Sequence, residues 1–190
     1  MRNAAVAVIA LTLLAQPLLH AIDIKVLSDK TYDFKSIRSW TWSPAGGEVK
    51  MLTTAQDDPA AVKKRFEPVI MDAVATNMTA RGYSKGNADA DIRLTYYVLI
   101  SAGAAAQTMG QFLPATTAWG LPPFTPQTSS LSVIEQGSVV IDMASVKLDE
   151  VIWRGVASAE VNRSMTEEER DARVRNAIKS LIAKLPKRQS

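Results

Sequence analysis

The chain has 190 residues, a length typical of one domain, and 47% of these residues are hydrophobic while 22% are charged. These values are ordinary for a globular protein with its own core. The formal net charge of +3 is small and offers no electrostatic case for nucleic-acid binding, which needs a clustered basic face. We therefore expect no nucleic-acid partner.

The first segment is typical of a secretory signal. Arg2 provides a positive start, an apolar run covers residues 4–14, and Ala21 is a small residue suited to a cleavage site. The alternative is a retained membrane anchor, but Gln16 and Pro17 interrupt the run before the roughly 20 apolar residues that a membrane span needs. We expect residues 1–21 to be removed, leaving a periplasmic protein without a transmembrane segment.

Removal of that segment would also remove His20, the only histidine, from a chain that contains no cysteine. A mature domain over residues 22–190 would then exclude a histidine-based triad, a thiol nucleophile and a zinc site with His or Cys ligands. Without cysteine the protein also cannot carry the lipid of a bacterial lipoprotein. We assign no catalytic residue, no metal site and no cofactor.

The first elements are expected to be strands. Alternation of apolar and polar residues predicts a strand over 22–27 with one buried face. Trp40 and Trp42 are two residues apart and would share one face of a second strand. Two tryptophans on one face indicate core packing more than ligand binding.

A helix is expected to begin at Asp57-Asp58-Pro59, because Asp is a favoured N-cap and Pro is tolerated at the first helical position. Apolar residues keep helical spacing from Val62 to Ala80, and Gly82 predicts the end of the helix. Pro68 lies inside this run. It lacks an amide hydrogen and clashes with the preceding turn, so we expect a kink or a restart there.

A strand is expected over 90–101, followed by a long inserted loop over about 102–133. No charged residue occurs between Arg93 and Glu135, and four prolines exclude a regular helix or central strand through most of the segment. Beyond it, residues 137–148 and 151–161 predict an antiparallel hairpin that turns at Asp149-Glu150.

The last element is predicted to be a helix. Thr166 and Glu169 form a capping-box pattern, an apolar stripe follows, and Pro186 marks the end. Two amphipathic helices need an apolar surface to cover, which one face of an antiparallel sheet supplies. The predicted fold class is therefore α+β: a two-layer domain with a mostly antiparallel sheet of about four to six strands and two helices on one face.

Several short motifs, taken in order, resemble the domain-of-unknown-function family 4136, which consists of small bacterial envelope proteins, many of them lipoproteins. The matching pieces are Tyr32-Asp33-Phe34, Trp42, Arg81-Gly82-Tyr83, Ala88-Asp89-Ala90-Asp91-Ile92, Tyr96, Gly137-Ser138-Val139-Val140-Ile141-Asp142, Val151-Ile152-Trp153-Arg154-Gly155, Ala157-Ser158 and Lys184-Leu185-Pro186. The resemblance covers about residues 32–186. It implies a periplasmic setting and no stated activity, and the missing cysteine departs from the lipid-tethered members.

Asp142 and Arg154 form the first candidate site, together with Trp153. If Asp142 lies opposite Val156 in the hairpin, then Asp142 and Arg154 are diagonal neighbours on one sheet face. A change of register by one residue would put them on opposite faces. The functional interpretation is an arginine that grips an anionic ligand, and the structural alternative is a cross-strand ion pair on a solvated face.

Two further candidates follow from composition. Asp89 and Asp91 lie at alternate positions where a strand begins, but two carboxylates are too few for a calcium or magnesium site. The uncharged loop carries the aromatic residues Phe112, Trp119 and Phe124, and an apolar patch of that kind indicates a docking surface. The loop could instead fold over the sheet or be disordered.

The leading hypothesis is a non-catalytic binding or accessory module of the cell envelope that uses the loop and the adjacent sheet. Its partner would be an envelope protein, a lipid or peptidoglycan. The alternative is a hydrolase of envelope glycans that works with a pair of carboxylates drawn from Asp89, Asp91 and Asp142. A peripheral membrane protein is a third interpretation, disfavoured because neither helix pairs a basic face with a bulky apolar one.

Overall fold

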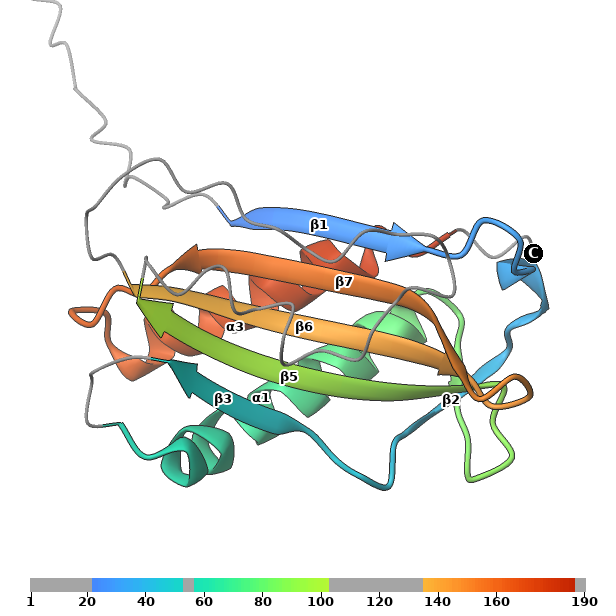
Figure 1. The fold of residues 1–190 in the computed structure, drawn as a ribbon, viewed down its shortest axis with the longest axis horizontal. Coiled ribbons are helices and arrows are strands. Elements are labelled where there is room, and N and C mark those ends of the chain that lie inside the picture. Colours follow the sequence, from blue (N-terminus) through green and yellow to red (C-terminus); the bar gives the residue numbers. More distant parts are fainter. Residues whose placement is uncertain (1–21, 53–56, 103–134, 187–190) are drawn as a thin grey trace, which may run out of the picture.

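A seven-stranded sheet forms one layer of the domain, and two helices form the other, as the computed structural model shows for residues 22–52, 57–102 and 135–186. Both helices lie behind the sheet in Figure 1. The predicted fold class, α+β with two helices on one sheet face, is confirmed. The sheet has seven strands rather than four to six, because two short strands, Glu48–Leu52 and Ser84–Lys85, were not predicted.

The bounds of the elements along the chain are β1 Asp23–Ser28, a short 3₁₀ helix Phe34–Ser36, β2 Ser39–Trp42, β3 Glu48–Leu52, α1 Pro59–Ala80, β4 Ser84–Lys85, β5 Ile92–Ala102, β6 Glu135–Ser145, β7 Glu150–Glu160 and α3 Glu167–Ile182. The order in the sheet is β1, β7, β6, β5, β2, β4, and β3 also pairs with β5. The pairs β1–β7, β7–β6 and β6–β5 are antiparallel, whereas the short strands β2, β3 and β4 pair in parallel.

Strands β2 and β3 share one edge of β5, with a tight turn between them. Gly46 has a φ of 70°, which glycine adopts without steric cost. At Gly47, a Cβ atom would lie 1.9 Å from the ring of Tyr96, so this close approach requires glycine. The turn thus lets the Tyr96 ring pass beneath the chain, where its hydroxyl donates to Glu67 of α1 at 2.8 Å.

Helix α1 begins and ends where the sequence predicts. The Asp58 side chain accepts from the amide of Ala60 at the N-cap. At the other end Gly82 has a φ of 83°, and the amides of Gly82 and Tyr83 donate to the carbonyls of Thr79 and Met78, a Schellman arrangement. The expected restart at Pro68 is wrong, since one helix runs through that residue.

Helix α3 confirms the predicted capping box. The Thr166 hydroxyl accepts from the amide of Glu169, and the Glu169 carboxylate accepts in return from the amide of Thr166. The first turn of α3 carries three glutamates, which favour the positive end of the helix dipole. The apolar stripe of α3 packs toward the sheet, with Ile178, Leu181 and Ile182 buried.

The β6–β7 hairpin differs from the prediction in its turn. The turn covers Val146–Asp149, with Asp149 at a φ of 55°, so β7 starts at Glu150. Met143 pairs with Trp153 and Ala144 with Val151, which leaves Ile152 as an extra residue in a bulge. The bulge lets both Ile152 and Trp153 enter the core, where they are 1% and 0% exposed.

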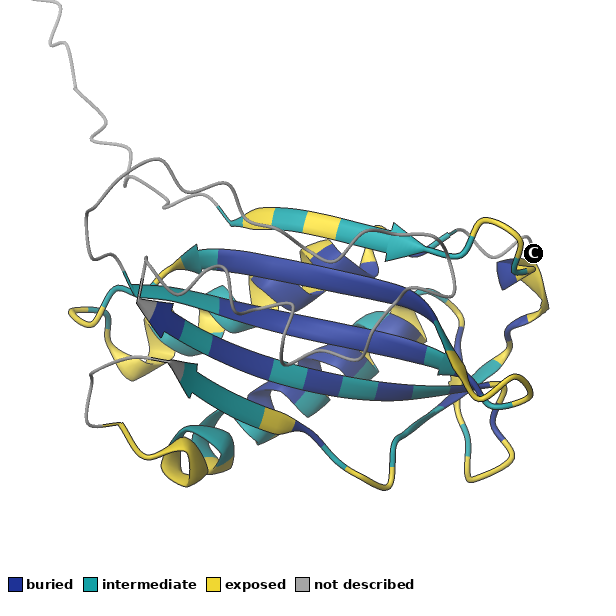
Figure 2. Cartoon of the chain, in the orientation of Figure 1, coloured by how far each residue is buried: buried dark blue, intermediate teal, exposed yellow. Residues whose placement is uncertain are grey.

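The core lies between the helices and the sheet. Its largest fully buried side chains include Trp40 and Trp153, and Trp42 packs against Trp40 edge to face at 5.7 Å, so the prediction of core packing for the Trp40–Trp42 pair is confirmed. The opposite sheet face, seen from the front in Figure 2, is also buried along the middle of β6 and β7. There Leu99, Val140 and Val156 form a second, small apolar cluster.

We expect Gly155→Ala to lower the free energy of unfolding by about 2 kcal/mol, measured by urea denaturation. A Cβ atom there would lie 2.3 Å from the Trp153 ring, which occupies the space beside the glycine. In a Trp153→Phe background the nearest ring atom is missing, so the cost of adding the methyl group should shrink. Gly137→Ala is the control, because its Cβ would meet a methyl group of Val161 at 3.3 Å and the Ala159 carbonyl oxygen at 3.9 Å, and no ring. Equal costs at the two glycines would contradict this packing account.

Candidate functional site

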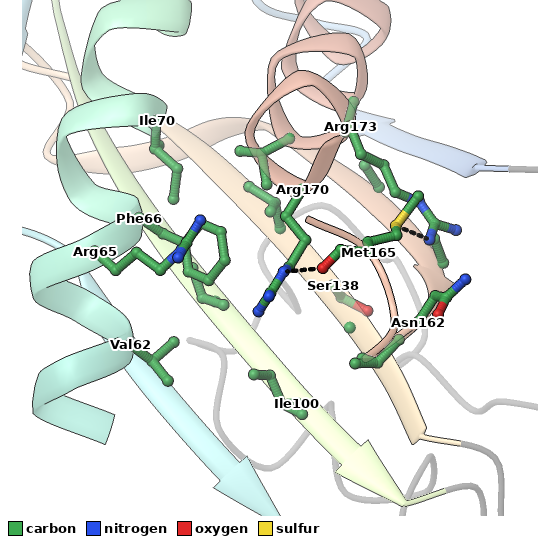
Figure 3. A pocket seen from close by; sticks show the side chains of 18 of the residues that line it. Val62, Arg65, Phe66, Ile70, Ile100, Ser138, Asn162, Met165, Arg170 and Arg173 are labelled. Atoms are coloured by element: carbon green, nitrogen blue, oxygen red, sulfur yellow. Dashed lines mark hydrogen bonds between the residues drawn. The ribbon is translucent and has the colours of Figure 1, made fainter. Parts of the chain in front are cut away.

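A cavity of about 370 Å³ opens between the two helices and the sheet (Figure 3). Helix α1 supplies one wall, with Val62, Phe66 and Ile70. Helix α3 supplies another, and β5, β6 and β7 form the floor. The apolar residues that complete the lining are Ile22, Ala61, Val98, Ile100, Gly137, Val139, Ala157, Ala159, Val161, Met165, Val174 and Ala177.

The cavity exists because side chains on the helix side of the hairpin become smaller toward one end. Met143 lies opposite Trp153, but farther along Val139 lies opposite Ala157, and Gly137 lies opposite Ala159. Hydrogen and methyl side chains cannot reach the helices that the larger residues support. The space that remains lies at the end of the sheet where β6 begins and β7 ends.

Four arginines line the cavity together with its apolar walls, and two of them are held by carboxylates. Arg65 of α1 pairs with Glu167 and Asp171 of α3, so it ties the two helices together. Arg163 pairs with Asp57 and Glu135 and connects the segments on either side of the cavity. Burial lowers the pKa of Arg65, but its hydrogen bonds to Glu167 and Asp171 together outweigh this and raise it. Hydrogen bonds to Glu135 and Asp57 raise the pKa of Arg163, so both guanidinium groups stay charged.

The other two arginines, Arg170 and Arg173, lie on α3 and contact the same residue, Met165 (Figure 3). The Nε of Arg170 donates to the carbonyl oxygens of Met165 and Thr166 at 3.2 and 3.3 Å. Nη1 of Arg173 lies 3.7 Å from the Met165 sulfur, a weak acceptor. Within the described part of the chain, neither arginine forms an ion pair.

Asp142 and Arg154 are brought together on the opposite sheet face, but not as predicted. They face each other directly across β6 and β7, because the shifted turn and the bulge alter the expected diagonal register. Nε and Nη2 of Arg154 donate to the two carboxylate oxygens, each at 2.6 Å. The expectation of a solvated face is wrong, since the side chains are 3% and 6% exposed.

In the buried pair, the charges of Asp142 and Arg154 balance each other. Burial raises the pKa of the Asp142 carboxyl, while the hydrogen bonds and charge of Arg154 act in the opposite direction. Farther along the same face, beyond Val140 and Val156, the hydroxyls of Ser138 and Ser158 share a hydrogen bond of 2.8 Å. The binding role of Asp142 and Arg154 stays a prediction, and their described contacts are those of a structural ion pair.

The remaining predicted binding residues are not gathered with this pair. Trp153 is fully buried on the helix side of β7, so it is a core residue and not part of the same face as Arg154. Phe112, Trp119 and Phe124 lie outside the described residues.

Asp91 connects two strands. Its carboxylate accepts from the amides of Arg38 and Ser39 at 2.7 and 2.8 Å, and from the Ser39 hydroxyl at 3.0 Å. Partial burial disfavours the charged form, but these hydrogen bonds outweigh it and lower the pKa of Asp91. This geometry fixes the start of β2 beside the start of β5, so Asp91 has a structural role.

The described residues hold no group of three or more His, Cys, Asp or Glu side chains that could bind a metal ion. None of Asp89, Asp91 and Asp142 lines the cavity, so the carboxylates of the hydrolase hypothesis are not collected there. Of the carboxylates that do line it, Asp57 pairs with Arg163 and Asp58 caps α1. Among the described helices, none is long and apolar enough to cross a membrane.

Sequence reasoning missed the cavity. The available signals were the small residues Ala157 and Ala159 at alternate positions of β7, and two arginines three residues apart on α3 beside its apolar stripe. Neither pattern indicates a cavity until the hairpin register and the position of α3 are known.

Comparison with known proteins identifies the family of this chain. The model of a domain of unknown function, DUF4136, matches residues 24–187. The chain belongs to the DUF4136 family. This confirms the resemblance drawn from the motifs. A search of the curated proteins gives no match.

Solved structures with a similar fold include a DUF4136 family protein from Bacteroides thetaiotaomicron, with a TM-score of 0.50, 16% identity, and coverage of 85% of this chain and 94% of that one. A PDZ domain protein from Parabacteroides distasonis has a TM-score of 0.56 and 13% identity over 90% of this chain and 37% of that chain. The PelC dodecamer from Paraburkholderia phytofirmans has a TM-score of 0.45 and 10% identity, covering 89% of this chain and all (100%) of that one. At these identities the likeness concerns the fold alone.

We expect Asp142→Asn to lower the free energy of unfolding by about 3 kcal/mol, because it leaves the buried Arg154 charge without its carboxylate. Replacing both residues, as Asp142→Leu with Arg154→Met, should recover most of this loss, because an apolar pair has no charge to desolvate. Urea denaturation of the two variants checks the prediction. A single variant as stable as the wild type would show that the pair contributes nothing.

Asp91 should make stability depend on pH. A lowered pKa in the folded state means that its contribution is present above the ordinary carboxyl pKa of about 4 and is lost as the pH falls through the folded value. Asp91→Asn should therefore cost about 1 kcal/mol near neutral pH and less near pH 3. The control is Asp89→Asn, an exposed carboxylate two residues earlier, which should change little at either pH. A cost for Asp91→Asn that is the same at both pH values would rule out this linkage.

Proposed function

We propose that this protein is a non-catalytic binding module of the bacterial cell envelope that holds the hydrocarbon chain of an amphiphilic molecule between α1, α3 and the sheet. The observation that carries the proposal is the cavity of about 370 Å³, whose lining is mostly apolar and also includes charged side chains. Ligand cavities usually measure roughly 300–1,000 Å³ and have mostly apolar linings with a few polar groups.

The size and lining of the cavity favour a single hydrocarbon chain. Its volume is near the lower end of the range for small-molecule sites. Water gains few hydrogen bonds from walls such as Val62, Phe66 and Val174. An apolar chain would remove the same walls from water and gain about 25 cal/mol for each Å² buried.

The envelope location is supported by the sequence. The first 21 residues are typical of a secretory signal, and the resemblance of the chain's motifs to the DUF4136 family implies a periplasmic setting. A module exported to that compartment would meet free fatty acids, lysolipids and other amphiphiles. The proposal keeps the binding role expected from the sequence and places the ligand in the cavity beneath the helices.

The proposal predicts that the neutral apolar fluorophore N-phenyl-1-naphthylamine binds the protein and that dodecanol displaces it. Ala159→Leu should weaken this binding about tenfold or more, because the larger side chain projects from the floor into the cavity. Fluorescence titration measures the affinity.

The matched control is Ala172→Leu, which makes the same change on an exposed position of α3 that does not line the cavity. It should bind as the wild type does. Thermal unfolding of both variants shows that they are folded. If a folded Ala159→Leu protein binds the fluorophore with wild-type affinity, the cavity is not the binding site.

A further inference from the structure

We infer that the ligand of this cavity has an anionic head group, a carboxylate or a phosphate, which the guanidinium groups of Arg170 and Arg173 receive at the mouth. The inference rests on the proposed function, because it specifies the head group of the molecule whose chain fills the cavity. The chemical class is a single-chain anionic amphiphile.

Arg170 and Arg173 extend from one face of α3 and lie on either side of Met165 (Figure 3). They are three residues apart, so they lie on the same face of α3. Each contacts Met165, which limits how far apart the two guanidinium groups can be. In Figure 3 the end of Arg170 extends from α3 into the space between α1 and the segment that carries Met165.

Both arginines have N–H donors that no described residue accepts. Only Nε of Arg170 donates within the described residues, which leaves its two Nη groups for a ligand. Nη2 of Arg173 is buried and has no acceptor there. Buried polar groups almost always have a hydrogen-bond partner, and a ligand oxygen would supply one for this nitrogen. Carboxylates and phosphates match the fork of a guanidinium group and can accept from two nitrogens at once.

The neighbouring carboxylates do not satisfy this need. Glu167 and Asp171 pair with Arg65, which lies on the facing helix. Asp57 and Glu135 pair with Arg163, and Asp58 caps α1. Glu160, at the end of β7, is exposed and is not in an ion pair with either arginine. The two cations on α3 therefore remain as the positive part of the mouth.

A purely structural role explains only part of this arrangement. The bonds from Nε of Arg170 to two backbone carbonyls fasten the segment before α3 to the helix. A glutamine or lysine could make such a bond without placing two guanidinium groups at the edge of an apolar cavity. The two positive charges match an anionic head group, and the apolar cavity matches a hydrocarbon chain. These are the two parts of an anionic amphiphile.

The test compares ligands that share a dodecyl chain and differ in the head group: dodecanoate, dodecyl phosphate, dodecanol and dodecyltrimethylammonium. Isothermal titration calorimetry of the mature chain at about pH 8, where both anionic head groups are ionised, measures each affinity below the micelle concentration. We expect the two anions to bind about tenfold or more tightly than the alcohol, and the cation to bind worst. The ratio of carboxylate to phosphate identifies the head group that the site prefers.

Arg170→Gln, Arg173→Gln and the double variant should lose this preference for anions, so that each of them binds dodecanoate and dodecanol with similar affinity. Arg175→Gln is the control, because it removes the same charge from an exposed position of α3 where Arg175 pairs with Asp72 outside the cavity. It should keep the wild-type preference. Thermal unfolding checks that each variant is folded.

Two results would overturn the inference while leaving the cavity intact. One is equal affinity of the wild type for dodecanoate and dodecanol. The other is a preference for anions that survives in the folded double variant. If none of the four ligands binds, or if Ala159→Leu binds all of them as the wild type does, the proposed function fails and the head-group inference fails with it.

Discussion

Asp142 and Arg154 face each other directly across β6 and β7, and this pairing register decides which side chains lie under the helices. With these two residues on the outer face, Met143 and Trp153 must point toward α1 and α3, and so must Gly155, Ala157 and Ala159. The bulge at Ile152 is part of the same arrangement, because the extra residue brings the strand back into register after the turn. A slip of one residue in β7 would turn Arg154 toward the apolar core and away from Asp142, and it would move the small residues away from the helices.

The register has opposite effects at the two ends of the hairpin. Near the turn, large side chains fill the space beneath the helices, and the absence of a side chain at Gly155 makes room for the Trp153 ring. Toward the open end, Ala157 and Ala159 leave space that no described side chain fills, which produces the cavity. Helix α3 crosses this end with its first turns, because the capping box at Thr166 starts the helix there. Arg170 and Arg173 therefore line the cavity.

The family and the similar solved structures concern the fold alone. What this protein can bind depends on its own side chains. A fold by itself does not determine function. A binding site forms where the residues of the particular chain supply both a cavity and suitable charges. Here the ion pairs of Arg65 and Arg163 use the nearby carboxylates, so two arginines remain beside an apolar cavity. The buried Asp142–Arg154 pair, in contrast, has both charges already matched by 2.6 Å contacts.

The sequence by itself determined the features that depend on neighbours along the chain. The caps at Asp58 and Thr166, the helix end at Gly82, the long strands and the α+β class all follow from local patterns whose causes lie within a few residues. The tertiary structure decided what depends on residues far apart. The direct pairing of Asp142 with Arg154 required the turn and the bulge, the short strands β3 and β4 required β5 and β2 as partners, and the burial of Trp153 required its place beneath α3. The cavity arose in the same way, because an empty volume is set by the side chains that fail to meet across it, and no local pattern records which side chains those are.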